Sequence, residues 1–251
     1  MGSTAYTTKV LITGANTGLG WQISKKLATE RKDYHIIMSG RSKDAIEKAV
    51  SDLQAQGVTN TESLVLDVTS DDSIAAAAKS VSEKHGRLDV LISNAGLTSD
   101  NGHDELDFSR EKWNMVFQVN VFGSALVTDA FIPLLEKSQS EAKRIIFMTS
   151  SLSSIGSLAD KSCPWRKENF RIYSTSKAAL NMLMMQYAVQ YDDDPSWKIN
   201  VCCPGHCATN LNAGKGMEPP EMGANNAVRL ATVGREGETG TFTNRHGTVP
   251  W

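Results

Sequence analysis

The chain has 251 residues, of which 40% are hydrophobic and 22% are charged, as expected for one globular unit with a large core. A formal net charge of −2 excludes a broad electrostatic attraction to nucleic acid or to an anionic membrane. No run of residues reaches the roughly 18 to 20 apolar positions of a membrane span, and the first residues lack a signal core. We therefore expect a cytoplasmic protein that binds neither nucleic acid nor membrane.

Short apolar runs that are rich in β-branched residues recur along the chain and are typical of buried strands. They occupy residues 9–13, 35–39, 63–66, 88–93, 144–149 and 198–202, and a weaker run at 239–244 predicts a seventh, edge strand. Helix-length segments with apolar residues three and four apart separate them, at 21–32, 42–56, 70–85 and near 220–232. Ser42 and Ser70 are predicted N-caps.

Strict alternation of strands and helices, without a repeat or a linker, predicts a single α/β domain over residues 1–251. Its fold class is a doubly wound Rossmann-type domain with a parallel sheet of about seven strands flanked by helices. Ligands bind beyond the carboxyl ends of such strands. Three polar or Gly-rich segments follow strands and are predicted substrate loops, at 96–109, 153–171 and 203–220.

The first strand runs directly into TGANTGLG at 13–20, which an amphipathic helix follows. Glycines allow a tight turn and a close approach of the backbone to a pyrophosphate, which the helix N-terminus stabilises. The spacing differs from G-x-G-x-x-G, and an ordinary strand-to-helix turn is the alternative. The candidate cofactor-binding residues of this turn are Gly14, Asn16, Thr17, Gly18, Leu19 and Gly20.

The second strand ends at Ser39-Gly40-Arg41, where a dinucleotide fold contacts the adenosine ribose. An acidic residue at this point favours NAD, whereas an arginine can accept the 2′-phosphate of NADP. The acid is missing and Arg41 is present, so we expect NADP(H), with NADPH preferred over NADH. The alternative is that Arg41 merely solvates the start of a helix.

Tyr173 and Lys177 lie four residues apart in YSTSK, at the start of a predicted helix, and so share one helical face. An ammonium beside a phenol lowers the pKa of the phenol from about 10 toward the neutral range in which it can act as an acid. The spacing alone is weak support, because many helices contain it.

Four cysteines are too few to staple a chain of this length. The cluster CCPGHC at 202–207 contains three of them, with His206 as a further possible ligand. Adjacent cysteines on a strand point to opposite faces, and no second ligand pair completes a tetrahedron. We therefore predict no metal site.

These motifs, in this order, resemble those of the short-chain dehydrogenase/reductase family, in particular its carbonyl reductases. The resemblance extends from residue 9 to about 210 and rests on TGANTGLG, Asp67-Val68, SNAG at 93–96, Asn120, the serines after the fifth strand, YSTSK and Pro204-Gly205. It implies a catalytic set of Asn120, Ser151, Tyr173 and Lys177. It also implies cofactor contacts by Tyr173 and Lys177 and by the residues that follow the strands, namely Asp67, Val68, Asn94, Ala95, Gly96, Pro204, Gly205 and Thr209.

In the implied roles, Tyr173 protonates the carbonyl oxygen of the substrate, Lys177 lowers its pKa and holds the nicotinamide ribose, and Asn120 anchors a proton-relay water. Ser151 orients the carbonyl, although Ser150, Ser153 and Ser154 are rivals for this role. Candidate substrate contacts, from position alone, are Leu97, Leu152, Trp165, Phe170, His206, Leu211 and Met217.

The expected function is NADPH-dependent reduction of a small-molecule aldehyde or ketone to an alcohol. The alternatives are an NAD(P)+-dependent secondary-alcohol dehydrogenase and a non-catalytic NADP(H)-binding sensor. The longer interval between the serines and Tyr173, and the tail GTFTNRHGTVPW, are nearer to the carbonyl reductases than to tetrameric members. We therefore expect a monomer or a homodimer. Trp113, Phe117 and Phe122 lie at helical spacing and are predicted core residues.

Overall fold

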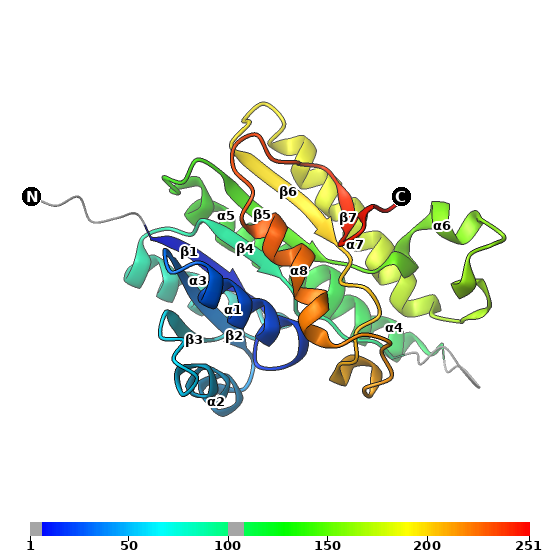
Figure 1. Ribbon diagram of the computed structural model, residues 1–251, viewed down its shortest axis with the longest axis horizontal. Coiled ribbons are helices and arrows are strands. Elements are labelled where there is room, and N and C mark those ends of the chain that lie inside the picture. The colour runs from blue at the N-terminus through cyan, green and yellow to red at the C-terminus, as the bar shows by residue number, and fades with distance from the viewer. Residues whose placement is uncertain (1–6, 100–107) are drawn as a thin grey trace, which may run out of the picture.

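Strands and helices alternate along the chain in the computed structural model, which describes residues 7–99 and 108–251 (Figure 1). Within these residues eight strands form one sheet, in the order β3-β2-β1-β4-β5-β6-β7-β8. They are β1 (Thr8–Ile12), β2 (Tyr34–Gly40), β3 (Thr61–Val65), β4 (Val90–Ser93), β5 (Lys143–Met148), β6 (Trp197–Cys202), β7 (Phe242–Asn244) and β8 (Gly247–Thr248). The predicted α/β fold class is confirmed, with one strand more than expected. Residues 100–107 of the predicted loop 96–109 lie outside the described residues.

The sheet is parallel except at its far edge. The segment 239–244 was expected to form the edge strand, but β7 pairs on both sides, because the chain reverses and adds β8 antiparallel to it. The reversal depends on Gly247, whose φ of 128° lies in a region that L side chains rarely adopt. The Asn244 side chain also accepts a hydrogen bond from the backbone N–H of His246.

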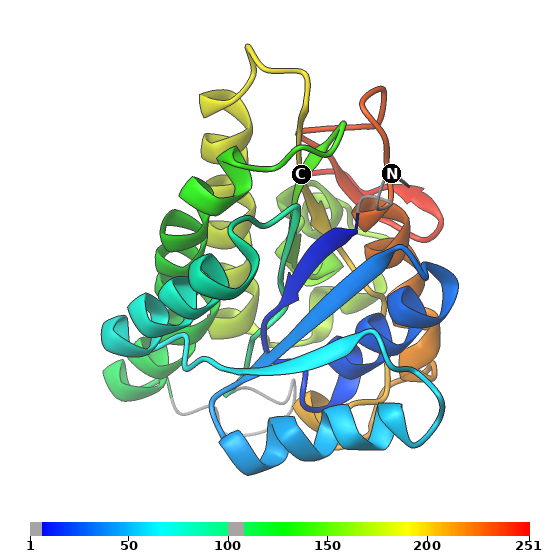
Figure 2. The same ribbon diagram turned by 90° about the vertical axis from the view of Figure 1, so that its left-hand side faces the viewer.

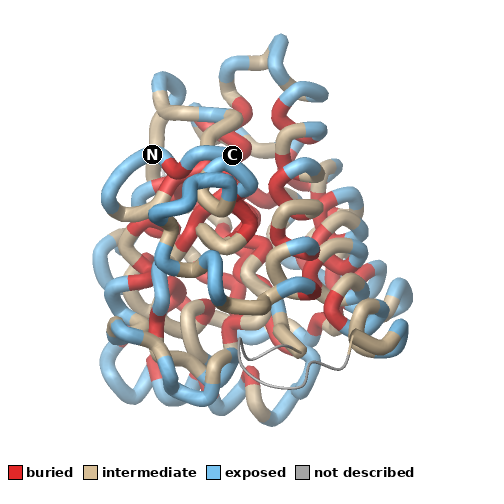
Figure 3. The backbone as a smooth tube through the Cα atoms, turned by 90° about the vertical axis from the view of Figure 1, so that its right-hand side faces the viewer, coloured by how far each residue is buried: buried red, intermediate tan, exposed pale blue. Residues whose placement is uncertain are grey.

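Helices cover both faces of the sheet, as Figure 2 shows. One layer holds α1 (Gly18–Glu30), α2 (Lys43–Gln54) and α8 (Pro220–Ala231), and the other holds α3 (Asp71–His85), α5 (Ser124–Glu136) and α7 (Arg171–Gln190). The remaining helical segments are α4 (Arg110–Phe117), the π-helix η1 (Gln118–Gly123), α6 (Ile155–Ala159) and the 3-10 turns η2 (Ser151–Ser153), η3 (Pro164–Lys167) and η4 (Asn210–Asn212). Buried positions concentrate along the strands and the inward helix faces (Figure 3).

Local signals in the sequence set the helix starts. The Ser42 and Ser70 hydroxyls accept hydrogen bonds from the first turns of α2 and α3, which confirms both predicted N-caps. Gly86 ends α3 in the left-handed conformation with a φ of 73°. Both capped helices also carry acidic residues in the first turn, which the helix dipole favours.

One continuous helical run, Arg110–Glu136, comprises α4, η1 and α5 and is long and apolar enough to cross a membrane by length and composition. Its residues Val127, Phe131 and Leu135 are fully buried in the core between the sheet and the outer helices. A helix that contributes to the core of a globular protein passes the same test of length and composition, and these residues belong to the core. The same run corrects one expectation, because Phe122 is 47% exposed and lies outside the core, while Trp113 and Phe117 are half-buried.

From β1 the chain first adds β2 and β3 on one side of the sheet, and then returns to add β4 and the later strands on the other side. The strand order therefore reverses between β1 and β4. A crevice forms at such a switch point, beyond the carboxyl ends of the strands, and dinucleotides bind there. The arrowheads of β1, β4, β5 and β6 point to this side of the molecule (Figure 1). The predicted cofactor and catalytic segments follow these strands.

Candidate active site

The glycine-rich turn after β1 packs closely at two of its glycines. Gly14 and Gly18 have φ values of 61° and 58°, which favour glycine. A Cβ atom on Gly20 would lie 2.5 Å from the carbonyl oxygen of Gly14, and one on Gly14 would lie 2.9 Å from Cα of Ala95. At Gly14 and Gly20 the turn therefore has no room for a side chain, while Asn16 and Thr17 carry their side chains toward the neighbouring pocket.

The amino end of α1 lacks the side-chain cap and the acidic first-turn residues that α2 and α3 have. Its N-cap residue Thr17 makes no side-chain capping hydrogen bond, and its first turn contains no acidic residue. The first N–H groups of a helix need an acceptor, and the helix dipole favours a negative one. This end of α1 therefore fits the pyrophosphate of a dinucleotide.

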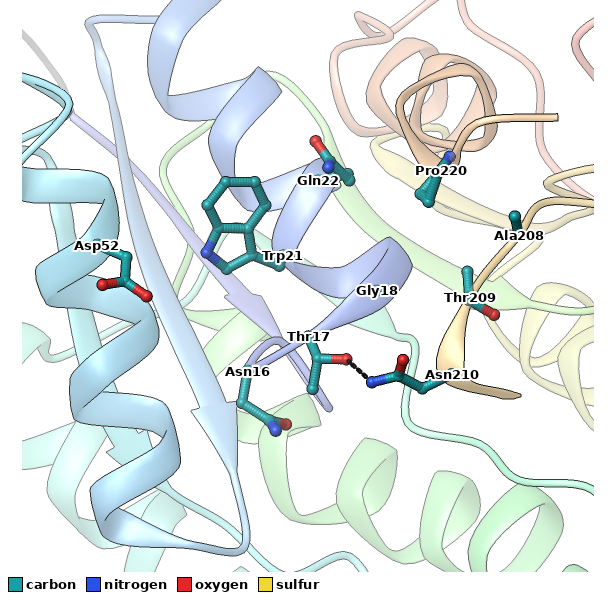
Figure 4. Close-up of a pocket in the computed structure, with 10 residues that line it drawn as sticks. All are labelled: Asn16, Thr17, Gly18, Trp21, Gln22, Asp52, Ala208, Thr209, Asn210 and Pro220. Carbon is teal, nitrogen blue, oxygen red and sulfur yellow. Dashed lines mark hydrogen bonds between the residues drawn. The ribbon is translucent and has the colours of Figure 1, made fainter. Parts of the chain in front are cut away.

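A shallow pocket of about 390 Å³ adjoins this turn, lined on one side by Thr17 and Gly18 and on the other by Thr209 and Asn210 (Figure 4). The Asn210 amide donates a hydrogen bond of 3.2 Å to the Thr17 hydroxyl. A Cβ on Gly18 would lie 3.7 Å from Cβ of Thr209. The segment after β6 thus reaches back to the glycine-rich turn, as the expected placing of Thr209 beside the cofactor requires.

Thr13 joins the glycine-rich turn to the residues after β4. Its hydroxyl accepts hydrogen bonds of 2.9 Å from the backbone N–H groups of both Asn94 and Ala95. The Asn94 amide in turn donates to the carbonyl oxygens of Thr13 and Gly14, at 2.8 and 3.1 Å. The Asn94 side chain was expected to contact the cofactor. It instead bonds to the glycine-rich turn that would bind the cofactor. Sequence reasoning did not assign a role to Thr13, although it opens the quoted motif.

The end of β2 presents Arg41 at the surface. Among the described residues its guanidinium has no hydrogen-bond or ion-pair partner. Hydrogen bonds from the backbone and then the hydroxyl of Thr69 lower the pKa of the Asp67 carboxyl, and the charge of Arg41 acts in the same direction. Arg41 follows β2 and Asp67 follows β3, and these strands are parallel neighbours that end together, at the edge where the adenosine of a dinucleotide would bind. The neighbouring Val68 is buried, and a Cβ on Gly123 would lie 2.6 Å from its carbonyl oxygen.

Lys177 is buried although it carries a charge. Only 4% of its surface is exposed, and its Nζ donates a hydrogen bond of 2.8 Å to the carbonyl oxygen of Met148, the last residue of β5. Burial lowers the pKa of this ammonium from 10.5 to about 8. The Nζ atom lies 5.8 Å from the centre of the Tyr173 ring. The predicted pairing of these two side chains on one helical face is therefore present in α7.

Gly96, which follows β4, lies close to both Lys177 and Asn120. A Cβ on this residue would lie 3.2 Å from Lys177 Nζ and 3.3 Å from Asn120 Oδ1. A side chain here would therefore push Lys177 Nζ or Asn120 Oδ1 aside by a few tenths of an ångström. Residues after β4, in η1 and in α7 therefore converge around Lys177.

Asn120 lies in the π-helix η1 and is fully buried. Its amide accepts from the Leu97 N–H and donates to the Leu97 carbonyl and the Ser176 hydroxyl, all at 2.9 Å. The Ser176 hydroxyl donates onward to the Tyr173 carbonyl at 2.7 Å. A π-helical turn commonly marks a functional site, because it re-aims a side chain within a helix. Here the π-helical turn directs the Asn120 amide to Ser176, and Ser176 in turn bonds to the backbone of Tyr173. The sequence did not predict this role of Ser176.

The serines after β5 differ in what their hydroxyls contact. The Ser153 and Ser154 side chains are buried and bonded within the scaffold, Ser153 to the Ser150 carbonyl at 2.6 Å and Ser154 to the Pro250 carbonyl at 2.5 Å. The Ser151 hydroxyl lies 3.0 Å from Sγ of Cys203. The Ser150 hydroxyl accepts a hydrogen bond from the Leu152 N–H, and no acceptor for its own proton is found among the described residues. Ser150 and Ser151 therefore stay the candidate donors, since either atom of the Ser151–Cys203 contact can supply the proton.

The segment after β6 forms the other wall. Cys202 and Cys203 lie on opposite faces of the sheet, as predicted, one in each core cluster. Pro204 and Gly205 follow, and the Gly205 N–H points to Cys203 Sγ at 3.4 Å. The rings of Trp165 and His206 meet edge to face with centroids 5.5 Å apart. Two of the expected substrate contacts, from separate loops, therefore lie together.

The segment 210–220 is held by backbone hydrogen bonds. The Met217 N–H donates to the His206 carbonyl at 2.8 Å, and the Ala208 N–H donates to the Glu218 carbonyl at 2.7 Å. The Glu218 carboxylate also pairs with the Arg245 guanidinium. This segment is thereby fixed to the turn that follows β7, and its end residues Asn210 and Pro220 line the pocket in Figure 4.

Comparisons with known proteins agree with this geometry. The sequence model of a family described as short chain dehydrogenase matches residues 8–219. A protein named Short-chain dehydrogenase anuI, from Penicillium roqueforti (strain FM164), is 37% identical over 227 residues, which cover 90% of this chain and 88% of that protein. Short-chain dehydrogenase/reductase ATR10, from Stachybotrys chlorohalonatus (strain IBT 40285), is 36% identical over 252 residues and covers 95% of this chain and 88% of its own.

Solved structures give the same result. NADPH-bound carbonyl reductase from chicken fatty liver superposes with a TM-score of 0.82 at 26% identity, covering 98% of this chain and 99% of that one. Salutaridine reductase from Papaver somniferum has a TM-score of 0.76 at 24% identity and covers 93% and 98% of the two chains. The second likeness concerns the fold alone.

Proposed function

Because the chain belongs to the short-chain dehydrogenase family, we propose that it is an NADPH-dependent reductase that converts an aldehyde or ketone of a small molecule to an alcohol. The observation that carries this proposal is the buried Lys177 ammonium beside the Tyr173 ring, at the carboxyl ends of the central strands. Proton transfer to a developing alkoxide needs a positioned acid, and a phenol beside an ammonium can supply one.

The residues of the crevice fit a dinucleotide. Gly14, Gly18 and Gly20 keep the turn tight, the amino end of α1 lacks a capping side chain, and the Arg41 guanidinium has no partner among residues 7–99 and 108–251. When bound, NADPH would supply two electrons to the carbonyl carbon as hydride. That a solved relative is described as NADPH-bound also supports this cofactor.

We propose that the residues around Lys177 handle the proton. Tyr173 donates it to the substrate oxygen as negative charge develops there, and the Lys177 ammonium stabilises the phenolate that remains. Asn120 and Ser176 hold the backbone of Tyr173 and Leu97 through the hydrogen bonds described above. Asn120 is thus a positioning residue, and Gly96 keeps the space open for the ammonium.

The donor that orients the carbonyl is tested by two alanine substitutions. Because the Ser151 hydroxyl is engaged with Cys203 Sγ, we expect Ser150→Ala to lower kcat/KM by about 10- to 100-fold, the value of one hydrogen bond to a charged oxygen. Ser151→Ala should lower it by less than about threefold. Steady-state kinetics with one carbonyl substrate compares the two variants, and the reverse order of effects would assign the role to Ser151.

Cofactor preference is tested at Arg41. We expect the native protein to use NADPH better than NADH, and Arg41→Asp to lower the ratio of their kcat/KM values by at least about 10- to 100-fold, since a charge-assisted hydrogen bond to the 2′-phosphate is lost. Lys43→Asp removes an exposed cation two residues away and controls for general electrostatics. Equal effects of both substitutions, or a native preference for NADH, would contradict a phosphate contact by Arg41.

Two other functions use the same site. A secondary-alcohol dehydrogenase would run the reaction in reverse, and its direction follows the cofactor ratio. A sensor that binds NADP(H) without turnover would need neither Tyr173 nor Lys177, yet both are present and adjacent. Assays with NADPH plus carbonyl compounds, and with NADP+ plus secondary alcohols, separate these functions. Binding without turnover in both would favour the sensor.

We further propose a cytoplasmic monomer or homodimer. The four cysteines, Cys163, Cys202, Cys203 and Cys207, are free thiols, which is usual in a reducing compartment. Analytical ultracentrifugation of the native chain measures its oligomeric state, and a tetramer would contradict the proposal.

A further inference from the structure

A second cluster of chemically active side chains lies at the opposite end of the sheet from the crevice. His35 is the second residue of β2, Glu62 is the second residue of β3, and His85 is the last residue of α3. These positions are at the amino ends of the strands, whereas the cofactor turn lies beyond the carboxyl ends. None of the three takes part in the reaction proposed above.

The fold directs the three side chains to one point. In the register of the sheet His35 pairs with Lys9, and Glu62 pairs with Ile37, two residues beyond His35. Side chains alternate between faces along a strand, so His35 and Ile37 share a face. Ile37 belongs to the core on the α3 side, and the last residue of that helix brings His85 to the same place.

The ligand atoms of the three side chains all lie within 4.8 Å of one another. The Glu62 carboxylate lies between the two imidazoles, with Oε1 2.5 Å from His85 Nε2 and Oε2 3.3 Å from His35 Nε2. The side chains of His85 and Glu62 are only 8% and 17% exposed. The group is therefore a partly buried pocket of ligands and not a set of solvated surface charges.

The ion pairs leave one ring nitrogen of His35 without a hydrogen bond among the described residues. Its Nε2 atom is buried and makes no hydrogen bond to any described residue, although it lies within ion-pair distance of Glu62. A buried polar atom without a hydrogen bond costs free energy. A metal ion coordinated by this nitrogen would satisfy it.

We propose that His35, Glu62 and His85 form a binding site for a divalent transition-metal ion of the zinc type. Two imidazoles and one carboxylate are a common zinc ligand set, with a water as the fourth ligand. Ligand atoms bound to one tetrahedral zinc at about 2.0 to 2.2 Å lie about 3.4 Å from one another. Glu62 Oε1 and His85 Nε2, at 2.5 Å, would therefore have to move apart, and any wider pair in the cluster would have to close; side-chain rotation can supply both changes. The ion would tie β2 and β3 to α3.

Lys84 competes with the ion for the same carboxylate. Its Nζ pairs with Glu62, and its side chain is 62% exposed, so it can turn away into solvent. A metal and this ammonium cannot both lie against one carboxylate oxygen. Neutralising Lys84 should therefore strengthen metal binding, an effect that a purely structural ion-pair cluster would not produce.

The test is a zinc titration of the full chain after removal of metal with a chelator, followed by calorimetry and thermal unfolding. We expect one zinc ion per chain and a Tm that rises with zinc concentration. His85→Asn and Glu62→Gln should each raise Kd by at least about tenfold, and Lys84→Met should lower it. His246→Asn, at an exposed histidine on the turn between β7 and β8, should leave Kd unchanged.

Because Lys84→Met alters only an exposed side chain, it keeps the proposal testable even if a ligand variant does not fold. Saturable binding that is insensitive to His85, Glu62 and Lys84 would place zinc elsewhere, for example on the cysteines, and would overturn the proposal. So would an absence of saturable binding. Neither result depends on the reductase activity, since the titration needs no cofactor or substrate.

Discussion

Replacing Tyr173 by Phe is expected to lower kcat for carbonyl reduction by about 10²- to 10⁴-fold, the contribution of a positioned proton donor. The substitution removes one hydroxyl and keeps the ring beside Lys177 Nζ. The Kd for NADPH should change by less than about twofold, because the glycine-rich turn and the amino end of α1 are untouched. Single-turnover kinetics together with cofactor titration by fluorescence separate the two quantities.

Tyr187→Phe is the matched control, since Tyr187 lies in the same helix α7. Its hydroxyl donates to the Asp129 carboxylate at 2.6 Å and lies 3.3 Å from the Ala125 carbonyl oxygen. We expect this variant to lose thermal stability while kcat stays within about twofold of the native value. A Tyr173→Phe variant that keeps native kcat would remove Tyr173 from the role of acid.

Replacing Lys177 by Met is expected to have an effect of similar size on kcat, again about 10²- to 10⁴-fold, because the phenolate of Tyr173 then has no cation beside it. The double variant with Tyr173→Phe should lose little more activity than either single variant, since the two residues act as a unit. Fully multiplicative losses would show that they act independently.

The same substitution should stabilise the protein in the absence of cofactor. Burial lowers the pKa of Lys177 to about 8 in the folded state, from 10.5, so folding disfavours the bound proton by about 3 kcal/mol at neutral pH. Loss of the hydrogen bond to the Met148 carbonyl offsets about 1 kcal/mol of this. We therefore expect Lys177→Met to raise the free energy of unfolding by about 2 kcal/mol at pH 7.

The sign of the pH dependence follows from the lowered pKa. Below about pH 8 both folded and unfolded states carry the proton, and the native protein bears the full penalty. Between about 8 and 10.5 the folded state has released the proton while the unfolded state still binds it, so the stability of the native protein rises. The advantage of Lys177→Met should disappear across this range in urea unfolding at several pH values. An advantage that persists above pH 10.5 would mean that packing, and not charge burial, causes it.

Local chemistry made much of the site predictable. Gly14 and Gly20 lie where backbone segments nearly touch, and Gly18 has a positive φ; such positions leave a readable pattern of glycines in the sequence. Lys177 and Tyr173 lie one helical turn apart, so helix geometry alone brings them together. The N-caps Ser42 and Ser70 were predictable for the same reason, because each satisfies its own helix.

Features that depend on distant segments were not predictable. The contact between Ser151 and Cys203 spans 52 positions, and it bears on which serine is left to orient a carbonyl. Phe122 was expected in the core, but helical spacing does not say which face of a helix meets the sheet, and Phe122 faces outward. The group of His35, Glu62 and His85 has no motif spacing, because three separate elements supply its members.

The most direct test of the central claim follows the transferred hydride to the product and asks whether its transfer depends on Tyr173. The native chain is incubated with NADPH that carries deuterium at the transferable position, together with a panel of aldehydes and ketones, and the alcohols are analysed by mass spectrometry. We predict deuterium on the carbinol carbon of at least one product with the native chain, and its absence with Tyr173→Phe over the same time. NADPH binding without deuterium transfer to any carbonyl, or equal transfer by both proteins, would contradict the account.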